Sequence, residues 1–228
     1  AVGGVLGIYY SEAVTQSVIR RCNNSAEINV VTNMPASGYV AGICGSVSNV
    51  AGSKSLTISS CINTGAIKTE SIACGVACGK EKMTVQNSAN TAAVHGTRTY
   101  GIAKVVEAAD NVASIGALER SLGNALWASC GAQCTNAYQS VTEGEDTYIV
   151  KKEDGFYYTS KDDRRVDQAL NNQVRAKKYE LSWTTGLTLD FESEQQSSFE
   201  SSLIESSSFN DSNISESNIS DSSDSSSS

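Results

Sequence analysis

Histidine, proline, excess positive charge and long apolar runs are all scarce in this sequence. Its 228 residues include one His and one Pro, and 17 Lys and Arg stand against 25 Asp and Glu, which gives a net charge of −8. A protein that binds DNA or RNA needs excess positive charge to neutralise phosphates, so this balance argues against a nucleic-acid partner. No run approaches the roughly 18 apolar residues of a membrane span, and the apolar start has neither the Met nor the basic flank of a signal peptide. We therefore expect contact with a membrane only through an anchor outside this chain.

The negative charge is confined to the C-terminal tail. Residues 192–228 hold eight acidic residues, no Lys or Arg, and 18 Ser in 37 positions. Taking those eight from 25 leaves 17 acidic residues against 17 basic ones in residues 1–191, so the body is neutral. A segment this polar and charged cannot bury enough apolar surface to fold. We predict a disordered Ser/Asp/Glu-rich spacer over 192–228.

Two short motifs alternate through residues 1–118. The first is a glycine-apolar motif, found at Gly4–Gly7, Gly42–Gly45, Gly75–Cys78 and Gly101–Lys104. The second contains a central Cys or Ser and flanking aliphatic residues, clearly at Ile19–Ile28 and Ile58–Ile67, more weakly at Val85–Val94, and in degenerate form at Asn111–Leu118. Short β-branched stretches bounded by Gly, Asn and Ser are typical of strands. The glycine motif recurs after 38, 33 and 26 residues, and its strict alternation with the second motif indicates a repeat architecture.

These features predict a mainly β fold, a β-solenoid of short irregular repeats over 1–118. Equivalent residues of successive units should then stack as ladders, with Cys22, Cys61 and Ser88 in one and Ile28, Ile67 and Val94 in another. Because Gly4–Gly7 is already half a unit, we expect the repeats to start upstream of this chain.

Two adjoining segments resemble the GLUG-type repeat. Tyr39-Val-Ala-Gly-Ile-Cys-Gly45 looks like its glycine strand, and Leu56-Thr-Ile-Ser-Ser-Cys-Ile-Asn-Thr-Gly-Ala-Ile67 looks like the strand that follows. The resemblance covers roughly residues 1–118, although the copy at Gly75 lacks the second glycine in register and the copy at Gly101 ends in lysine. It implies a large bacterial or protist surface protein of the adhesin-like kind. Such repeats mark an architecture and a location, not a reaction.

The pattern changes between residues 119 and 191. A hairpin around Gly155 is predicted from Thr147–Lys152 and Phe156–Thr159. A helix capped by Asp162 or Asp163 and running to Lys178 is predicted from the apolar stripe of Val166, Leu170 and Val174. Leu181–Asp190 reads as a last strand or hairpin. We predict an α+β module that caps the open end of the solenoid, where strand edges would otherwise stay unpaired.

The seven cysteines have two possible roles. The spacing of Cys74 with Cys78, and of Cys130 with Cys134, permits structural zinc. For Cys74 and Cys78, however, a place in a repeat strand favours buried or disulfide-bonded cysteines. Cys130 and Cys134 lie outside the repeats around a flexible glycine, so they are the better disulfide candidates. We expect no metal and no cofactor.

Catalytic residues are not indicated. His95 lacks an orienting partner or nucleophile signature and is interpreted as a turn residue. The carboxylates between Glu143 and Asp163 are interleaved with Lys and Arg at predicted turns and a helix start, which indicates a solvated surface rather than the paired carboxylates of a glycosidase. Asn23, Asn210, Asn213 and Asn218 begin N-glycosylation sequons.

Together these features predict a non-enzymatic cell-surface or secreted glycoprotein of the adhesion or surface-antigen type, displayed on a Ser-rich stalk. Its partner would be a protein or glycan on another cell or on a host surface. A secreted carbohydrate-active β-helix enzyme, lyase or hydrolase, is one alternative. An intracellular scaffold with a phosphorylatable acidic tail is the other.

Overall fold

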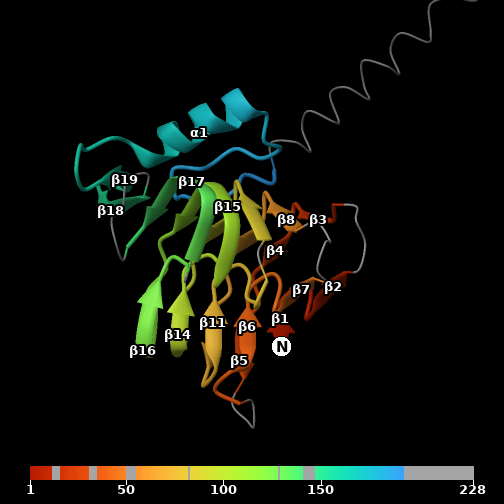
Figure 1. The fold of residues 1–228 in the computed structure, drawn as a ribbon. Coiled ribbons are helices and arrows are strands. Elements are labelled where there is room, and N and C mark those ends of the chain that lie inside the picture. Colours follow the sequence, from red (N-terminus) through yellow and green to blue (C-terminus); the bar gives the residue numbers. More distant parts are fainter. Residues whose placement is uncertain are drawn as a thin grey trace, which may run out of the picture. The chain divides into compact units, whose positions relative to one another are not determined.

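The computed structural model describes residues 1–11, 16–30, 35–49, 55–81, 83–127, 129–140 and 147–192. The chain divides into two units, Ala1–Phe191 and Glu192–Ser228. The first unit is mainly β, with a curled parallel sheet and, among the described residues, one α-helix (Figure 1). The predicted disorder of the spacer concerns residues that, from 193 on, lie outside the described ranges.

Three sheets contain all the described strands. The seven-stranded sheet contains β1 (Val2–Gly3), β5 (Ile28–Val30), β6 (Tyr39–Ala41), β10 (Ile67–Thr69), β11 (Ile72–Cys74), β14 (Val94–Tyr100) and β16 (Leu118–Ala125). The ten-stranded sheet contains β3 (Val18–Arg20), β4 (Asn23–Asn24), β8 (Leu56–Ser59), β9 (Ile62–Asn63), β12 (Met83–Gln86), β13 (Ala89–Asn90), β15 (Val105–Ser114), β17 (Ser129–Gln139), β18 (Thr147–Glu153) and β19 (Phe156–Thr159). A third pairs β2 (Tyr9–Ser11) with β7 (Val47–Asn49).

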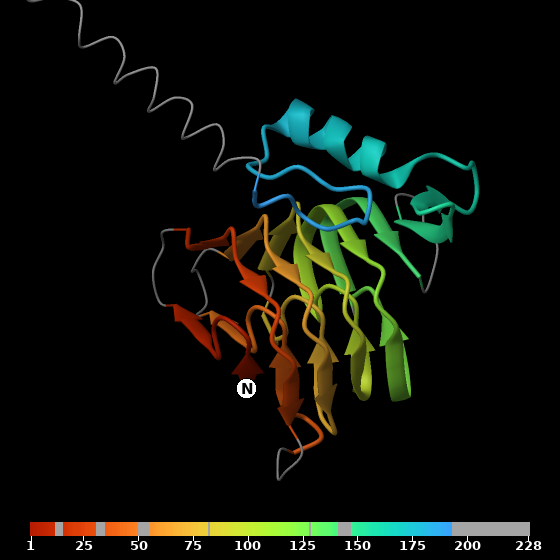
Figure 2. The ribbon, with the colours of Figure 1, turned by 180° about the vertical axis from the view of Figure 1, so that it is seen from behind.

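Equivalent residues of successive repeats stack in parallel register. Ile67 pairs with Ile28 on one side and with Val94 on the other, and Val94 pairs in turn with Leu118. This confirms the predicted aliphatic ladder. Ile67 and Val94 are buried in this ladder, and Ile28 and Leu118 are partly buried against them, so apolar burial joins successive repeats. Figure 2 shows the short strands side by side in the same order.

A second kind of ladder explains why the glycine motif and the asparagine motif alternate. The amide nitrogen Nδ2 of Asn24 donates to Oδ1 of Asn63 at 2.7 Å, and that of Asn63 donates to Oδ1 of Asn90 at 2.8 Å. Each of these side chains lies against a glycine of the other motif. A Cβ on Gly42 would come within 2.3 Å of Cγ of Asn63, and a Cβ on Gly75 within 2.5 Å of Cβ and Cγ of Asn90. The glycines are therefore needed because the asparagine side chains occupy the space that a larger residue would fill.

The parallel ladder continues past residue 118. Strand β16 pairs with β14, and β17 pairs with β15. One residue at the bend of each repeat, called its corner residue, shows the same continuation. These residues adopt a left-handed conformation, with φ between 44° and 58°, in five successive repeats: Arg21, Ser60, Asn87, Asn111 and Asn136. The sequence motifs indicated four units ending at 118, whereas the corners mark five. The proposed boundary at 118/119 falls at the first residue of β16.

The C-terminal module has the predicted elements with one correction. Strands β18 and β19 form the expected antiparallel hairpin, and both Asp154 and Gly155 have positive φ, as its tight turn requires. The helix α1 spans Val166–Lys177, but its N-cap is Arg165, which makes no side-chain cap. The prediction of Asp162 or Asp163 as the cap is therefore wrong. The hydroxyl of Thr159 donates a hydrogen bond to the carboxylate of Asp162, and the carboxylate of Asp163 forms an ion pair with Lys151.

The helix and the segment after it lie along the flank of the stack and not over its end. Val166 and Leu170 of α1, with Leu181, Trp183, Leu187 and Leu189, form one buried cluster with residues of four repeats: Ile62, Ala89, Ala113 and Tyr138. Figure 1 shows α1 crossing above β15 and β17. Only the hairpin extends the C-terminal edge, because β18 pairs with β17. Within this module, the hairpin thus continues the edge of the sheet, and α1 with the segment after it connects the repeats laterally.

Candidate functional site

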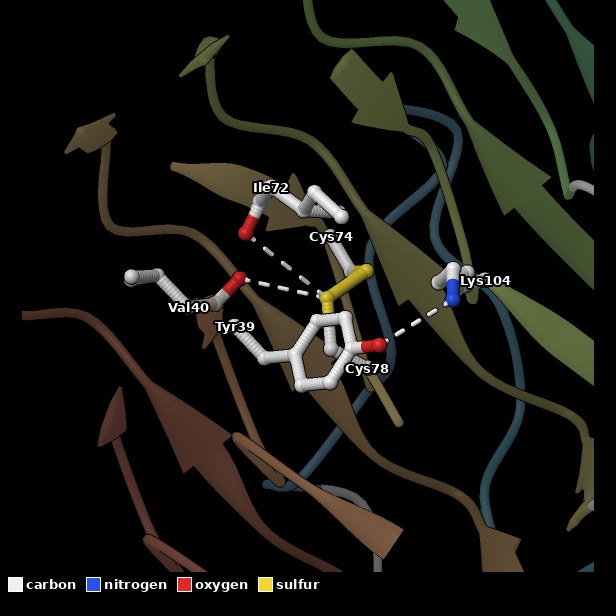
Figure 3. The surroundings of a disulfide bond; sticks show 6 residues. All are labelled: Tyr39, Val40, Ile72, Cys74, Cys78 and Lys104. Atoms are coloured by element: carbon white, nitrogen blue, oxygen red, sulfur yellow. Dashed lines mark hydrogen bonds between the residues drawn. A yellow bond between two sulfur atoms is a disulfide. The ribbon is translucent and has the colours of Figure 1, made fainter. Parts of the chain in front are cut away.

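Oxidised cysteines are the first functional feature that the structure places. Cys74 and Cys78 form a disulfide with a Cα–Cα distance of 5.6 Å, and both residues are fully buried. The two cysteines belong to a small buried cluster, and Tyr39 packs against it. Nζ of Lys104 lies 5.0 Å from the centre of the Tyr39 ring and 3.2 Å from its hydroxyl (Figure 3). The spacing of four had also permitted zinc. Sequence reasoning ranked this pair below Cys130 and Cys134 because it lies inside a repeat.

The other predicted site residues are dispersed. Cys134 is disulfide-bonded, while the side chain of Cys130 lies outside the described residues. Asn23 is exposed in β4, and Asn210, Asn213 and Asn218 lie outside the described ranges. His95 lies in strand β14 and not at a turn, so that interpretation is wrong.

His95 lies on an exposed surface and not in an enclosed site. Its Nδ1 is 3.5 Å from Oε2 of Glu119, the register partner of His95 on β16. Both side chains are at least half exposed. No nucleophilic cysteine takes part in this contact.

Asp110 is the most densely hydrogen-bonded carboxylate among the described residues. Its Oδ1 accepts from Oγ1 of Thr135 at 2.6 Å and from Nδ2 of Asn136 at 2.8 Å. Its Oδ2 accepts from Nζ of Lys177 at 2.7 Å and from the hydroxyl of Tyr179 at 2.6 Å. No motif in the sequence marks this residue, because its partners come from β17 and from the region at the end of α1.

These four donors decide the charge state of Asp110. Burial by itself raises the pKa of the carboxyl group, but the hydrogen bonds from Lys177, Thr135, Tyr179 and Asn136 outweigh burial, so the pKa lies below its ordinary value. The same contact acts on Tyr179, whose pKa is raised by burial and by the hydrogen bond to the carboxylate. A carboxylate with four donors and a lowered pKa is a poor general base. Asp110 therefore ties the end of α1 to the sheet.

A groove lies beside Asp110. It has a volume of about 410 Å³ and crosses strands β12, β15 and β17, with the end of α1 as one wall. Its lining is mixed: Thr84, Gln86, Gln133 and Thr135 contribute hydroxyl and amide groups, and Val85, Ala108 and Ala109 contribute apolar surface. The two charged groups in the lining, Asp110 and Lys177, neutralise each other. The groove therefore presents groups that both donate and accept hydrogen bonds, and almost no net charge.

In the described part of the chain, no group of three or more His, Cys, Asp or Glu side chains is placed to hold a metal ion. Within the same ranges, no helix has the length and apolar character to cross a membrane.

Comparison with known proteins gives no match. No protein-family model matches the chain, no curated protein is significantly similar to it in sequence, and no solved structure matches its fold. The resemblance to GLUG-type repeats therefore stays a prediction from the two segments that carry it.

Proposed function

We propose that this chain is a non-enzymatic cell-surface or secreted protein, in which a β-solenoid of short repeats presents a groove, lined in part by hydroxyl and amide groups, to neutral glycans. The acidic Ser-rich tail would act as the spacer that holds the repeats away from their attachment. The solenoid is supported by the register of the stacked repeats and by the five equivalent corners.

The observation that carries the proposed location is the pair of oxidised sites. Cys74 is joined to Cys78, and Cys134 is also disulfide-bonded. Structural disulfides form and persist in secreted and surface proteins and are rare in the cytosol, where thiols are kept reduced. The buried bond at Cys74 and Cys78 makes no contact that suggests a catalytic redox centre, since Tyr39 and the neighbouring strands cover it.

The chemistry of the groove supports binding in preference to catalysis. Neutral sugars carry many hydroxyl groups, and the hydroxyl and amide side chains of Thr84, Gln86 and Gln133 can donate to them and accept from them. The volume of about 410 Å³ is in the usual range of small-ligand sites. The carboxylate of Asp110, in the lining of the groove, already accepts hydrogen bonds from four donors. A strongly charged ligand would find no unneutralised charge to bind.

A binding assay with the folded chain tests the glycan part of the proposal. Immobilised neutral oligosaccharides, such as β-linked glucose and N-acetylglucosamine chains, would be compared with sulfated forms of the same sugars. We expect binding to a neutral sugar that falls at least about tenfold, or about 1.4 kcal/mol, in the double variant Gln86→Ala and Gln133→Ala. The exposed Asn29→Ala on β5, far from the groove lining, is the matched control. Equal binding by the groove variant and the control, or binding to sulfated sugars alone, would reject the groove as the contact surface.

A further inference from the structure

Two free thiols meet where the first repeat contacts the second. Cys22 and Cys61 each directly precede one of two paired residues, Asn23 on β4 and Ile62 on β9. The amide of Ile62 donates to the carbonyl oxygen of Cys22 at 2.8 Å, which fixes the two strands in register. Neighbouring strands lie about 4.8 Å apart, and disulfides join cysteines whose Cα atoms are about 4.4–6.8 Å apart. The backbone therefore already holds this pair at a bridging distance.

The two side chains also share one orientation. Sγ of Cys22 lies 3.3 Å from the carbonyl oxygen of Arg20, and Sγ of Cys61 lies 3.3 Å from that of Ser59. Arg20 and Ser59 are themselves register partners on β3 and β8, so the two thiols occupy equivalent positions side by side. Burial is the main cause that raises the pKa of Cys61, and the neighbouring thiol of Cys22 raises it further.

The pairing is confined to the first two repeats. The third repeat has Ser88 at the same position, and its hydroxyl accepts from the backbone amide of Cys61 at 3.1 Å. Cys44, the third free cysteine among the described side chains, belongs to the glycine motif. Cys61 is fully buried, whereas Cys22 is partly exposed, so a reagent from solvent meets Cys22 first.

We propose that Cys22 and Cys61 are a thiol pair that a small-molecule disulfide, such as oxidised glutathione, converts into a covalent bond between the first and second repeats. The thiolate of Cys22 attacks one sulfur of the oxidant, which breaks its S–S bond and releases one glutathione thiolate. Cys61 then loses its proton to solvent and attacks the sulfur of Cys22, which expels the second glutathione. In sum, the two protein thiols lose two protons and two electrons, and the oxidant gains both.

The bond would hold the most exposed repeat of the described chain. Val5, Ile8, Tyr10 and Val18 are the large apolar side chains exposed in the described residues, and all belong to the first repeat. Joining Cys22 to Cys61 ties this repeat to the buried second one.

The second step of the reaction should be slow near neutral pH. Burial raises the pKa of Cys61 to about 12, so little of it is thiolate there. The rate of bond formation should therefore rise about tenfold for each unit of pH below this value, because only the thiolate attacks. Below pH 8 the glutathione adduct of Cys22 should accumulate first.

Mass spectrometry of the full chain in a glutathione buffer tests the proposal without reference to its location or ligand, so it can fail while the proposed function stands. The intact mass of the wild type and of the control Cys44→Ser should each fall by the mass of two hydrogen atoms. Digestion of either protein should give a disulfide-linked peptide that contains Cys22 and Cys61. The variant Cys61→Ser should stop at one bound glutathione, and Cys22→Ser should gain neither product. Serine is the natural residue at the third position of this ladder, so both serine variants are expected to fold, which circular dichroism checks. A wild type that keeps glutathione on Cys22 at every pH, or that links Cys22 to Cys44, would overturn the proposal.

Discussion

Replacement of Asn63 by alanine removes the middle residue of the asparagine ladder. Asn63 is fully buried and takes part in three hydrogen bonds: it donates to Asn90 Oδ1 at 2.8 Å and to the carbonyl of Gly65 at 2.9 Å, and it accepts from Asn24 Nδ2 at 2.7 Å. A buried hydrogen bond contributes about 1 kcal/mol, and partners left unsatisfied add to the loss. We therefore expect the variant to lower the free energy of unfolding by about 3 kcal/mol.

Thermal and urea denaturation followed by circular dichroism would measure this loss. For a domain of this size, 1 kcal/mol corresponds to about 2–4 °C, so the midpoint temperature should fall by about 6–12 °C. Asn29→Ala is the matched control, since Asn29 is exposed on β5 in the other sheet, and its effect should stay within about 0.5 kcal/mol. If the two variants were equally stable, the ladder would not be what holds neighbouring repeats together.

Three further predictions concern other parts of the structure. Gly101→Ala should be destabilising, because its Cβ would lie 2.2 Å from Oγ and 2.7 Å from Cβ of Ser114. In a double-mutant denaturation cycle, adding Ser114→Gly to this variant should recover at least about 1 kcal/mol of the free energy of unfolding. Strictly additive effects of the two substitutions would contradict this. Asp110→Asn should cost about 2 kcal/mol at pH 7, measured by denaturation across pH. The pKa of this carboxyl group is lowered, so its contribution is present above the unfolded value of about 3.9 and is lost as the pH falls through the folded value. A stability difference that does not shrink as the pH falls below the unfolded value would count against the hydrogen-bonded carboxylate. Burial raises the pKa of Cys44 to about 11, so its alkylation at pH 7 should be at least about 100-fold slower in the native than in the unfolded protein, as peptide mapping would show; fast labelling would mean that Cys44 is not buried.

The sequence predicted the repeats because their stacking requires identifiable residues. Ile28, Ile67 and Val94 recur at equivalent places, and their stacking follows from the periodicity alone. The sequence motifs did not reveal the fifth repeat, because the residues around its corner residue, Asn136, match neither motif. In the structure, the left-handed backbone of Asn136 identifies this repeat. Asn and Gly are the residues that most readily adopt this conformation, so Asn87, Asn111 and Asn136 were the available signal.

The candidate site could not be predicted from the sequence, because it depends on contacts between distant segments. Asp110 and Lys177 are 67 residues apart, and neither belongs to a motif. The position of the helix was missed for the same reason. A stripe of Val166 and Leu170 indicates that one face of the helix is buried, but it does not tell which surface covers that face.

The most direct test of the proposed function is to locate the full-length protein in the cells that make it. Intact cells would be treated with an amine-reactive biotin reagent that does not cross membranes, and the protein would be quantified in the medium, in the biotinylated fraction and in the cell interior, with a cytosolic protein as the control. Exposed Lys68 on β10 offers a reactive amine in the folded part of the chain. The account predicts the protein in the medium or in the biotinylated fraction while the cytosolic control stays unlabelled. Protein that is found only in the interior, and labelled only after lysis, would contradict it.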